Sequence, residues 1–389
     1  MAPYEEVTHT GWGGNIKNSF TGFLVGIVMF IAAFPLLWWN EGRVNLANIA
    51  KTSEVAEAGQ AGNMNGKFVS ITGEISADNP VFDTVFMKSG KYVVVNRDVE
   101  YYAWDEDIHS QTKKNVGGSS DTIKTYTYKL SWQSSPKSVG DFNSSGVNQW
   151  ENERNVVIKN VAESISSDSF KANTAKIGKW IVDPDNISID VPGEKISLDE
   201  KTAKLSGKMK ITDGKYIYIP YLASSTGENN FNDIRISFNG LENGTKMTAF
   251  GEANGNSLDS YKYSEDENEP AFSRVLLGDR ATAISTLNAE YQMLTWILRG
   301  VGFLLMWIGL SSLFGPLVSV LNVLPFLGDV GGAIIGIITF VVAAVLSFLT
   351  IIISAIFHNI IALIIVAVII IALIVIVMAT KKKKASAAQ

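Results

Sequence analysis

The sequence contains no cysteine and only three histidines, His9, His109 and His358. Disulfide frameworks, thiol redox chemistry, cysteine nucleophiles and cysteine-ligated zinc or iron–sulfur centres are therefore excluded. The three histidines lie far apart in the sequence and lack the close spacing that metal ligands usually have. We therefore expect no metal site and no cofactor.

Basic charge is also scarce. The net charge is −5 and the isoelectric point is about 5.4, so the chain lacks the basic surplus that nucleic-acid binding requires. The serine-rich stretch 164–169 has no nearby histidine, and the acidic clusters 105–107 and 265–267 are typical of solvated loops. We therefore predict a protein that is not an enzyme and does not bind nucleic acid.

Charged residues make up only 18% of the chain, below the roughly 25% of an average protein. The deficit is local, because residues 297–378 contain only two charges, Arg299 and Asp329. A helix crosses the hydrocarbon core of a bilayer with about 20 apolar residues. Four segments meet this requirement and predict transmembrane helices at residues 20–39, 300–321, 333–356 and 360–378.

The first predicted span is interpreted as an uncleaved anchor. It ends in Trp38 and Trp39, which suit the headgroup boundary, and no signal-peptidase site follows it. We expect the membrane-exit motif to set the depth of the span without taking part in chemistry. This motif comprises Trp38, Trp39, Asn40, Glu41, Gly42 and Arg43.

Charge next to the spans predicts the topology. Four spans place both termini on one side, and the lysines that follow the last span place that side in the cytoplasm by the positive-inside rule. Arg299, on the opposite side, argues against this orientation but is outnumbered. The cytoplasmic parts are then residues 1–19 and the tail 379–389, which contains Lys381, Lys382, Lys383 and Lys384.

The region between the first two spans is polar and reads as an extracytoplasmic domain of mainly antiparallel β structure. Apolar and polar positions alternate from about residue 66 to residue 260, and we assign the β-rich domain to residues 66–272. We expect helical stalks at 40–65 and 273–299 to frame this domain. Asp213-Gly214 and Asn243-Gly244 are typical of type I′ hairpin turns. Candidate strands are 67–75, 92–104, 122–132, 208–211, 216–219, 233–241 and 246–252.

Small residues recur at helix-packing intervals within the spans. Gly22 and Gly26 form one such pair, and Gly332 and Gly336 form another, at the boundary between a predicted interfacial loop at 322–332 and the third span. Pairs of this kind let helix backbones approach closely in lipid. The pattern fits packing between copies or within one chain, and both alternatives stay open.

Several longer motifs resemble the transmembrane protein 43 family, also called LUMA. They are WWNEGR at 38–43, RDVEYYAWDED at 97–107, YTYKLSW at 126–132, NDIRISFNG at 232–240 and TWILRGVGFLLMWIGL at 295–310. The order of one span, a large loop and three further spans also agrees. Within the last motif the family-like positions are Thr295, Trp296, Leu298, Arg299, Gly302, Met306, Gly309 and Leu310.

The resemblance implies a location. For animal members it implies the endoplasmic reticulum and inner nuclear membrane, with emerin and lamins as partners. Loops rich in Asn, Ser and Gly and the absence of cysteine instead favour a bacterial member here, in the inner membrane with its large domain periplasmic or extracellular. The nuclear-envelope partners do not carry over to such a protein.

These observations together predict an integral membrane protein with an α+β architecture that acts as a non-enzymatic scaffold. Its expected partners are the lipid bilayer, further copies of itself and other membrane proteins. One alternative is a channel or transport accessory subunit, which conductance across planar bilayers would reveal. A second alternative is an extracytoplasmic ligand sensor, which a ligand-dependent thermal shift would reveal.

Overall fold

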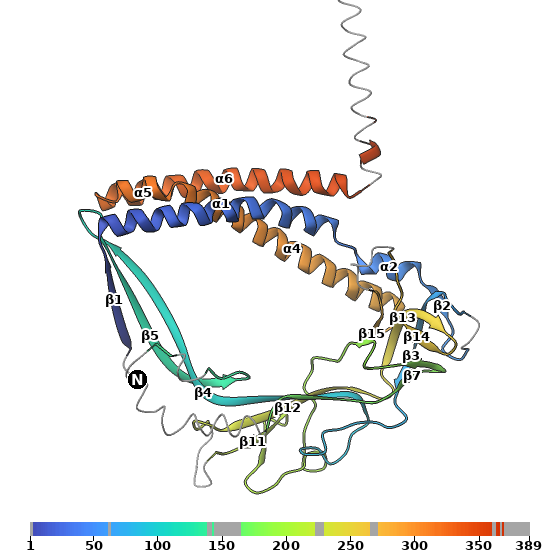
Figure 1. The fold of residues 1–389 in the computed structure, drawn as a ribbon. Helices are drawn as coiled ribbons and strands as arrows, with labels where there is room; N and C mark the ends of the chain where they lie inside the picture. Colours follow the sequence, from blue (N-terminus) through green and yellow to red (C-terminus); the bar gives the residue numbers. More distant parts are fainter. Residues whose placement is uncertain are drawn as a thin grey trace, which may run out of the picture. The chain divides into compact units, whose positions relative to one another are not determined.

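The computed structural model describes residues 3–60, 64–137, 142–143, 165–221, 229–264, 271–359, 363–365 and 368. The chain divides into two compact units, which are described separately. Figure 1 labels the helices and strands of the chain. The first comprises Met1–Glu6, Asn45–Ser110 and Lys124–Ala289. The second comprises Val7–Val44, Gln111–Ile123 and Glu290–Gln389.

One sheet has seven strands among the described residues, and its strand pairs that have a described register are antiparallel. The order is β1-β5-β4-β12-β11-β10, with β6 also paired to β4. Its core contains Val95, Val99, Ile236 and Phe238, all buried. The strands are β1 (Tyr4–Thr10), β4 (Tyr92–Lys114), β5 (Ser120–Gln133), β6 (Asp168–Lys171), β10 (Lys210–Thr212), β11 (Tyr216–Ile219) and β12 (Ile234–Glu242).

A second sheet has eight described strands in the order β2-β3-β7-β8-β14-β13-β15-β9, and β3 also pairs with β13. Trp180, Ile71 and Ile177 are fully buried in its core. The strands are β2 (Glu54–Ala56), β3 (Phe68–Ser76), β7 (Ala175–Ile177), β8 (Trp180–Val182), β9 (Ser188–Ile189), β13 (Lys246–Asn254), β14 (Ser257–Asp259) and β15 (Arg274–Leu277). The mainly β character predicted from alternation is confirmed.

The two predicted hairpins have different outcomes. Asp213 and Gly214 have φ angles of 53° and 61° and join the antiparallel pair β10 and β11, as predicted. The Asn243-Gly244 prediction is wrong, because β12 and β13 belong to different sheets. The Asn243 side chain instead accepts the Ala77 backbone N–H at 3.0 Å and donates to the Ala77 carbonyl, which stabilises a crossing between sheets.

A buried ion pair lies in the first unit. Arg97 donates to Asp83 at 2.7 Å, and the two side chains are 9% and 0% exposed. The second carboxylate oxygen of Asp83 accepts the backbone N–H groups of Val85 and Phe86. Asp168 lies 3.7 Å from the same guanidinium but is 54% exposed. Asp83 is therefore the principal counter-charge of Arg97.

The helices account for the membrane character. By length and composition, three described segments could cross a bilayer, at Trp12–Thr52, Arg280–Leu313 and Pro325–Phe357. The predicted fourth span at 360–378 lies almost entirely outside the described residues. The individual helices are α1 (Trp12–Gly42), α2 (Leu46–Thr52), α4 (Arg280–Leu313), α5 (Gly315–Leu321) and α6 (Pro325–Phe357).

Several predicted boundaries are wrong around the spans. Within 322–332 only residues 322–324 lie outside helices, because Pro325 begins α6 with a backbone already suited to a first helical turn. The span predicted at 300–321 is interrupted at Phe314, because Pro316 lacks an N–H and starts the separate helix α5.

The predicted stalks are also only partly helical. Within 40–65, α1 ends at Gly42, and the seven-residue α2 is followed by strand β2. Within 273–299, β15 precedes the helix, and α4 starts at Arg280. Asp279 accepts the Thr282 backbone N–H at 2.9 Å and also its hydroxyl, and these bonds hold the pKa of Asp279 below its ordinary value. The cap explains why the helix begins there.

Replacing Asp83 by Asn should destabilise the protein by roughly 3 kcal/mol, because it leaves the buried Arg97 without its counter-charge. Asp168→Asn is the matched control and should cost less than about 1 kcal/mol, because that carboxylate is half exposed. Thermal unfolding of both purified variants in the same detergent measures the difference. Equal losses of stability would contradict the assignment.

Candidate functional site

Five of the eight family-like residues of α4 share one face of the helix. Thr295, Arg299, Gly302, Met306 and Gly309 follow one another at intervals of four and three residues. Such spacing places side chains on one stripe of an α-helix. The sequence therefore already contained a packing signal beyond the motif itself.

The facing stripe on α1 has the same spacing, at Gly26, Phe30, Ala33, Leu37 and Asn40. Ala33, Leu37 and Asn40 are completely buried, and the first two share a core with Met306. Gly309, late in the α4 stripe, contacts Gly26 and Phe30 at the start of the α1 stripe. Gly302, earlier in α4, contacts Leu37 near the end of the α1 stripe, so the two helices run antiparallel. We call this contact the α1–α4 seam.

Glycines make the seam close. A Cβ atom on Gly309 would lie 2.7 Å from the Phe30 backbone nitrogen and 2.9 Å from the Gly26 carbonyl oxygen. A Cβ on Gly302 would lie 2.5 Å from a methyl group of Leu37. The backbones of α1 and α4 therefore meet directly at Gly309. Such close contact strengthens the dispersion attraction between the helices, which matters in lipid because the hydrophobic effect does not drive helices together there.

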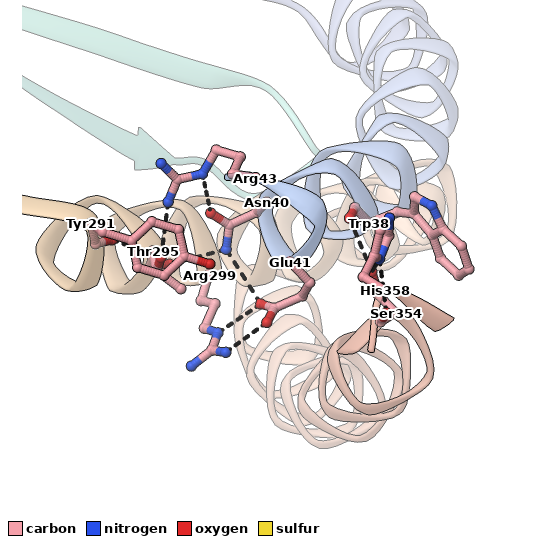
Figure 2. Close-up of polar contacts among 9 residues, drawn as sticks. All are labelled: Trp38, Asn40, Glu41, Arg43, Tyr291, Thr295, Arg299, Ser354 and His358. Carbon is pink, nitrogen blue, oxygen red and sulfur yellow. Dashed lines mark hydrogen bonds and ion pairs between the residues drawn. The ribbon is translucent and has the colours of Figure 1, made fainter. Parts of the chain in front are cut away.

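An ion pair closes the polar end of the seam (Figure 2). Arg299 donates to both carboxylate oxygens of Glu41, at 2.8 and 2.7 Å. The Glu41 side chain is only 7% exposed and that of Arg299 is 25% exposed. The Glu41 carboxylate therefore neutralises the Arg299 guanidinium at this end of the seam.

Arg43 forms a second set of contacts at this end. Its guanidinium donates to the Thr295 hydroxyl at 2.8 Å and to the Asn40 side-chain oxygen at 3.2 Å. It also lies over the rings of Trp39 and Tyr291. The buried Asn40 in turn donates to the Thr295 carbonyl at 3.2 Å. Polar groups at this boundary therefore bond to one another.

The end of α6 joins the same cluster (Figure 2). The Ser354 hydroxyl donates to the Trp38 carbonyl at 2.9 Å, and the His358 ring packs edge-on against the Trp38 ring. A Cβ on Gly42 would lie 2.5 Å from Nε2 of His358, so a larger residue here would displace the imidazole. Gly42 of the exit motif thus has a packing role.

The structure brings most predicted residues together, but not all. Trp296 is 65% exposed beneath the Arg299 guanidinium, and Leu310 packs at the edge of the helical core. Leu298 is half-buried. Gly26 faces Gly309 within one chain, whereas Gly22 and Gly336 have open space where a Cβ would lie. Gly332 is in ordinary contact with Val318. The tail lysines Lys381, Lys382, Lys383 and Lys384 lie outside the described residues.

Sequence reasoning missed Tyr291, Ser354 and His358. In the sequence His358 lies between the spans predicted at 333–356 and 360–378, and no spacing rule connects it with Gly42 or Trp38 across more than 300 positions. In the part of the chain that the structure describes, no group of three or more acidic or histidine side chains could hold a metal ion. The site is a closed polar network that can fix helix ends in place.

Glu41→Gln should lower stability by roughly 2 kcal/mol, because Arg299 loses the partner that neutralises it in a largely desolvated position. Glu54→Gln is a matched control, since the Glu54–Lys67 pair is half exposed and should contribute less than about 1 kcal/mol. Adding Arg299→Gln to Glu41→Gln should recover part of the loss. A midpoint of thermal unfolding unchanged by Glu41→Gln would show that the pair contributes nothing.

Gly309→Leu should disrupt the seam and cost about 3 kcal/mol, because the new side chain would overlap the α1 backbone. Gly300→Leu on the same helix meets open space and should be neutral or slightly stabilising. Unfolding midpoints in detergent compare the two variants. Similar midpoints would refute the close approach.

Comparison with known proteins supports the resemblance seen in the motifs. The family model described as Transmembrane protein 43 matches residues 101–360, which include the whole of α4. The Transmembrane protein 43 homolog of Drosophila melanogaster is 24% identical over 307 residues, which cover 74% of this chain and 75% of that protein. No solved structure matches the chain. Because the family model covers well over half of the sequence, the chain belongs to the transmembrane protein 43 family.

Proposed function

We propose that this protein is a non-enzymatic membrane scaffold that forms homo-oligomers and organises other membrane proteins at the bilayer. The observation that carries the proposal is the closed polar network at the end of the seam. Glu41, Arg43 and Arg299 are all bonded to side chains of the same network. Such a network serves to hold the point where the chain leaves the membrane, and a scaffold needs a fixed exit.

Self-association is supported by an exposed sheet edge. β1 is the terminal strand of the seven-stranded sheet, and among the described residues β5 is its single strand partner. Pro3 to His9 are all exposed, and Val7 is 61% exposed. An exposed edge of seven residues is a template for pairing with another chain. We propose that β1 pairs with a second copy.

The membrane orientation of the scaffold is a further part of the proposal. The three long apolar helices support a membrane protein. An extracytoplasmic position for the β structure rests on the predicted cytoplasmic location of Lys381, Lys382, Lys383 and Lys384. In a bacterial member the membrane would be the inner membrane.

Val7→Lys should weaken the oligomer, because a charged side chain on an edge strand opposes strand addition. Val55→Lys is a matched control, since Val55 is 72% exposed on the three-residue terminal strand β2. Light scattering of the protein in mild detergents and nanodiscs should give a multiple of the 42.3 kDa chain for the parent and the control. A parent mass of one chain would refute the oligomer, and an unchanged Val7→Lys mass would refute the β1 contact.

A further inference from the structure

The tip of the β4–β5 hairpin contacts the start of α1. Residues 111–123 belong to the same compact unit as the long helices. Asn15 donates to the Gly118 carbonyl at 2.9 Å and accepts the Ser120 hydroxyl at 3.0 Å. A Cβ on Gly118, whose φ is +82°, would overlap the Trp12 ring. The tip therefore packs directly against the first turn of α1.

The same tip contacts the start of α6. The Gly117 backbone N–H donates to the Val323 carbonyl at 3.0 Å, in the short turn between α5 and α6. Lys114 forms an ion pair with Asp329 at 2.6 Å. On the α1 side, Asp121 lies 2.6 Å from the His9 ring. Two helix starts thus share one polar hairpin tip.

The other end of α1 carries the Glu41–Arg299 and Asn40–Thr295 contacts. Asn15 and Asn40 are 25 residues apart, which corresponds to about 37 Å along a helix. This length exceeds the roughly 30 Å hydrocarbon core of a bilayer. If α1 crossed the membrane, the hairpin tip and Arg43 would lie on opposite sides.

The chain between these two points cannot cross a membrane. Residues 44–114 contain no apolar run of 18 residues, and the helix described within them, α2, is seven residues long. Strands with open edges do not occur in hydrocarbon, because their backbone groups would lose hydrogen bonds. The end of β4 carries Lys113 and Lys114, which are costly to bury there. Arg43 and the hairpin tip must therefore face the same aqueous side.

We propose that α1 lies in the plane of one leaflet, with α5 and α6 beside it, and that both ends of α1 face the aqueous side occupied by the β structure. The long helices are then embedded without crossing, unlike the spans predicted from length and composition. Figure 1 shows α1, α5 and α6 side by side. Contacts near both ends of α6 keep it beside α1. Near the start of α6, Asp329 pairs with Lys114 of the hairpin tip, and near its end Ser354 donates to the Trp38 carbonyl of α1. This inference goes beyond the proposed scaffold and does not depend on whether the chain oligomerises.

The partner of this surface is the acyl-chain layer of a single leaflet. Phe20, Leu24, Val28 and Ile31 form one stripe of α1, and each is more than half exposed. On α6, exposed Ile337, Val341, Val345 and Phe348 form a stripe on the face opposite to its buried residues. A helix that lies in the membrane plane buries its apolar face at the boundary between headgroups and acyl chains. In this arrangement the polar groups at the two helix ends stay at the headgroups.

Thiol labelling tests the topology, and the absence of native cysteine removes background. Gly11→Cys places a thiol at the start of α1, where the glycine is exposed with open space, and Val55→Cys places one in the β structure. A membrane-impermeant maleimide is applied to sealed right-side-out and inverted vesicles. We expect both thiols to react in the same vesicle type. Reaction of Gly11→Cys and Val55→Cys from opposite sides would overturn the proposal.

Depth measurements provide a second test that does not rely on labelling chemistry at the helix end. Nitroxides are attached to single cysteines at Leu24, Val28 and Ile31, and their depth is obtained from relaxation by oxygen and by a water-soluble nickel complex. An in-plane α1 gives the same depth at all three positions. A crossing helix changes depth by about 1.5 Å per residue, and such a gradient would overturn the proposal even if self-association is confirmed.

Discussion

The helical unit depends on the pairing of Glu41 with Arg299 at the polar end of the α1–α4 seam. An isolated charge at the edge of hydrocarbon would be expensive, but two opposite charges joined by two hydrogen bonds form a neutral group there. The pair joins residues that are 258 positions apart, and the β-rich part of the chain lies between them. The entry and exit of that whole segment are therefore held at one point.

Close backbone contact continues this constraint along the seam. Gly26, Gly302 and Gly309 allow α1 and α4 to approach more closely than larger side chains would permit. The fully buried Ala33 and Leu37 then pack against Met306, and Ala343 brings α6 into the same core. Polar pairing fixes the end of the helices, and small side chains fix their separation. Neither the ion pair nor the small side chains alone would determine both the position of the helix ends and the distance between the helices.

Chain connectivity then limits the arrangement in the membrane. Hydropathy measures only whether a helix is long and apolar enough to cross, and all three long helices satisfy that measure. The hairpin tip adds a requirement that hydropathy does not measure. Asn15, at the end of α1 remote from Glu41, donates to the Gly118 carbonyl, so that end of α1 must be within reach of the tip. A polar chain segment that connects the two ends of an apolar helix without crossing the bilayer favours a helix lying within one leaflet.

Local and compositional features were predictable from the sequence, since they depend on neighbouring residues. Apolar runs indicated the long helices, alternation indicated the strands, and Asp213-Gly214 indicated a turn whose residues both adopt positive φ. The family motif at 295–310 was also recognisable, and its intervals of four and three residues already described one helix face. Pro316 and Pro325 mark helix starts in the sequence, although their effect on the span boundaries was not predicted.

Choice of distant partners was decided only by the tertiary structure. The Asn243-Gly244 turn has hairpin residues, yet its strands join different sheets because core packing selects strand partners. In the sequence Glu41 and Arg299 are separate charges at the ends of predicted spans, and His358 is an isolated histidine. Folding places Glu41 beside Arg299 and His358 beside Gly42. A sequence determines which groups need a partner, whereas packing in three dimensions determines which partner is within reach.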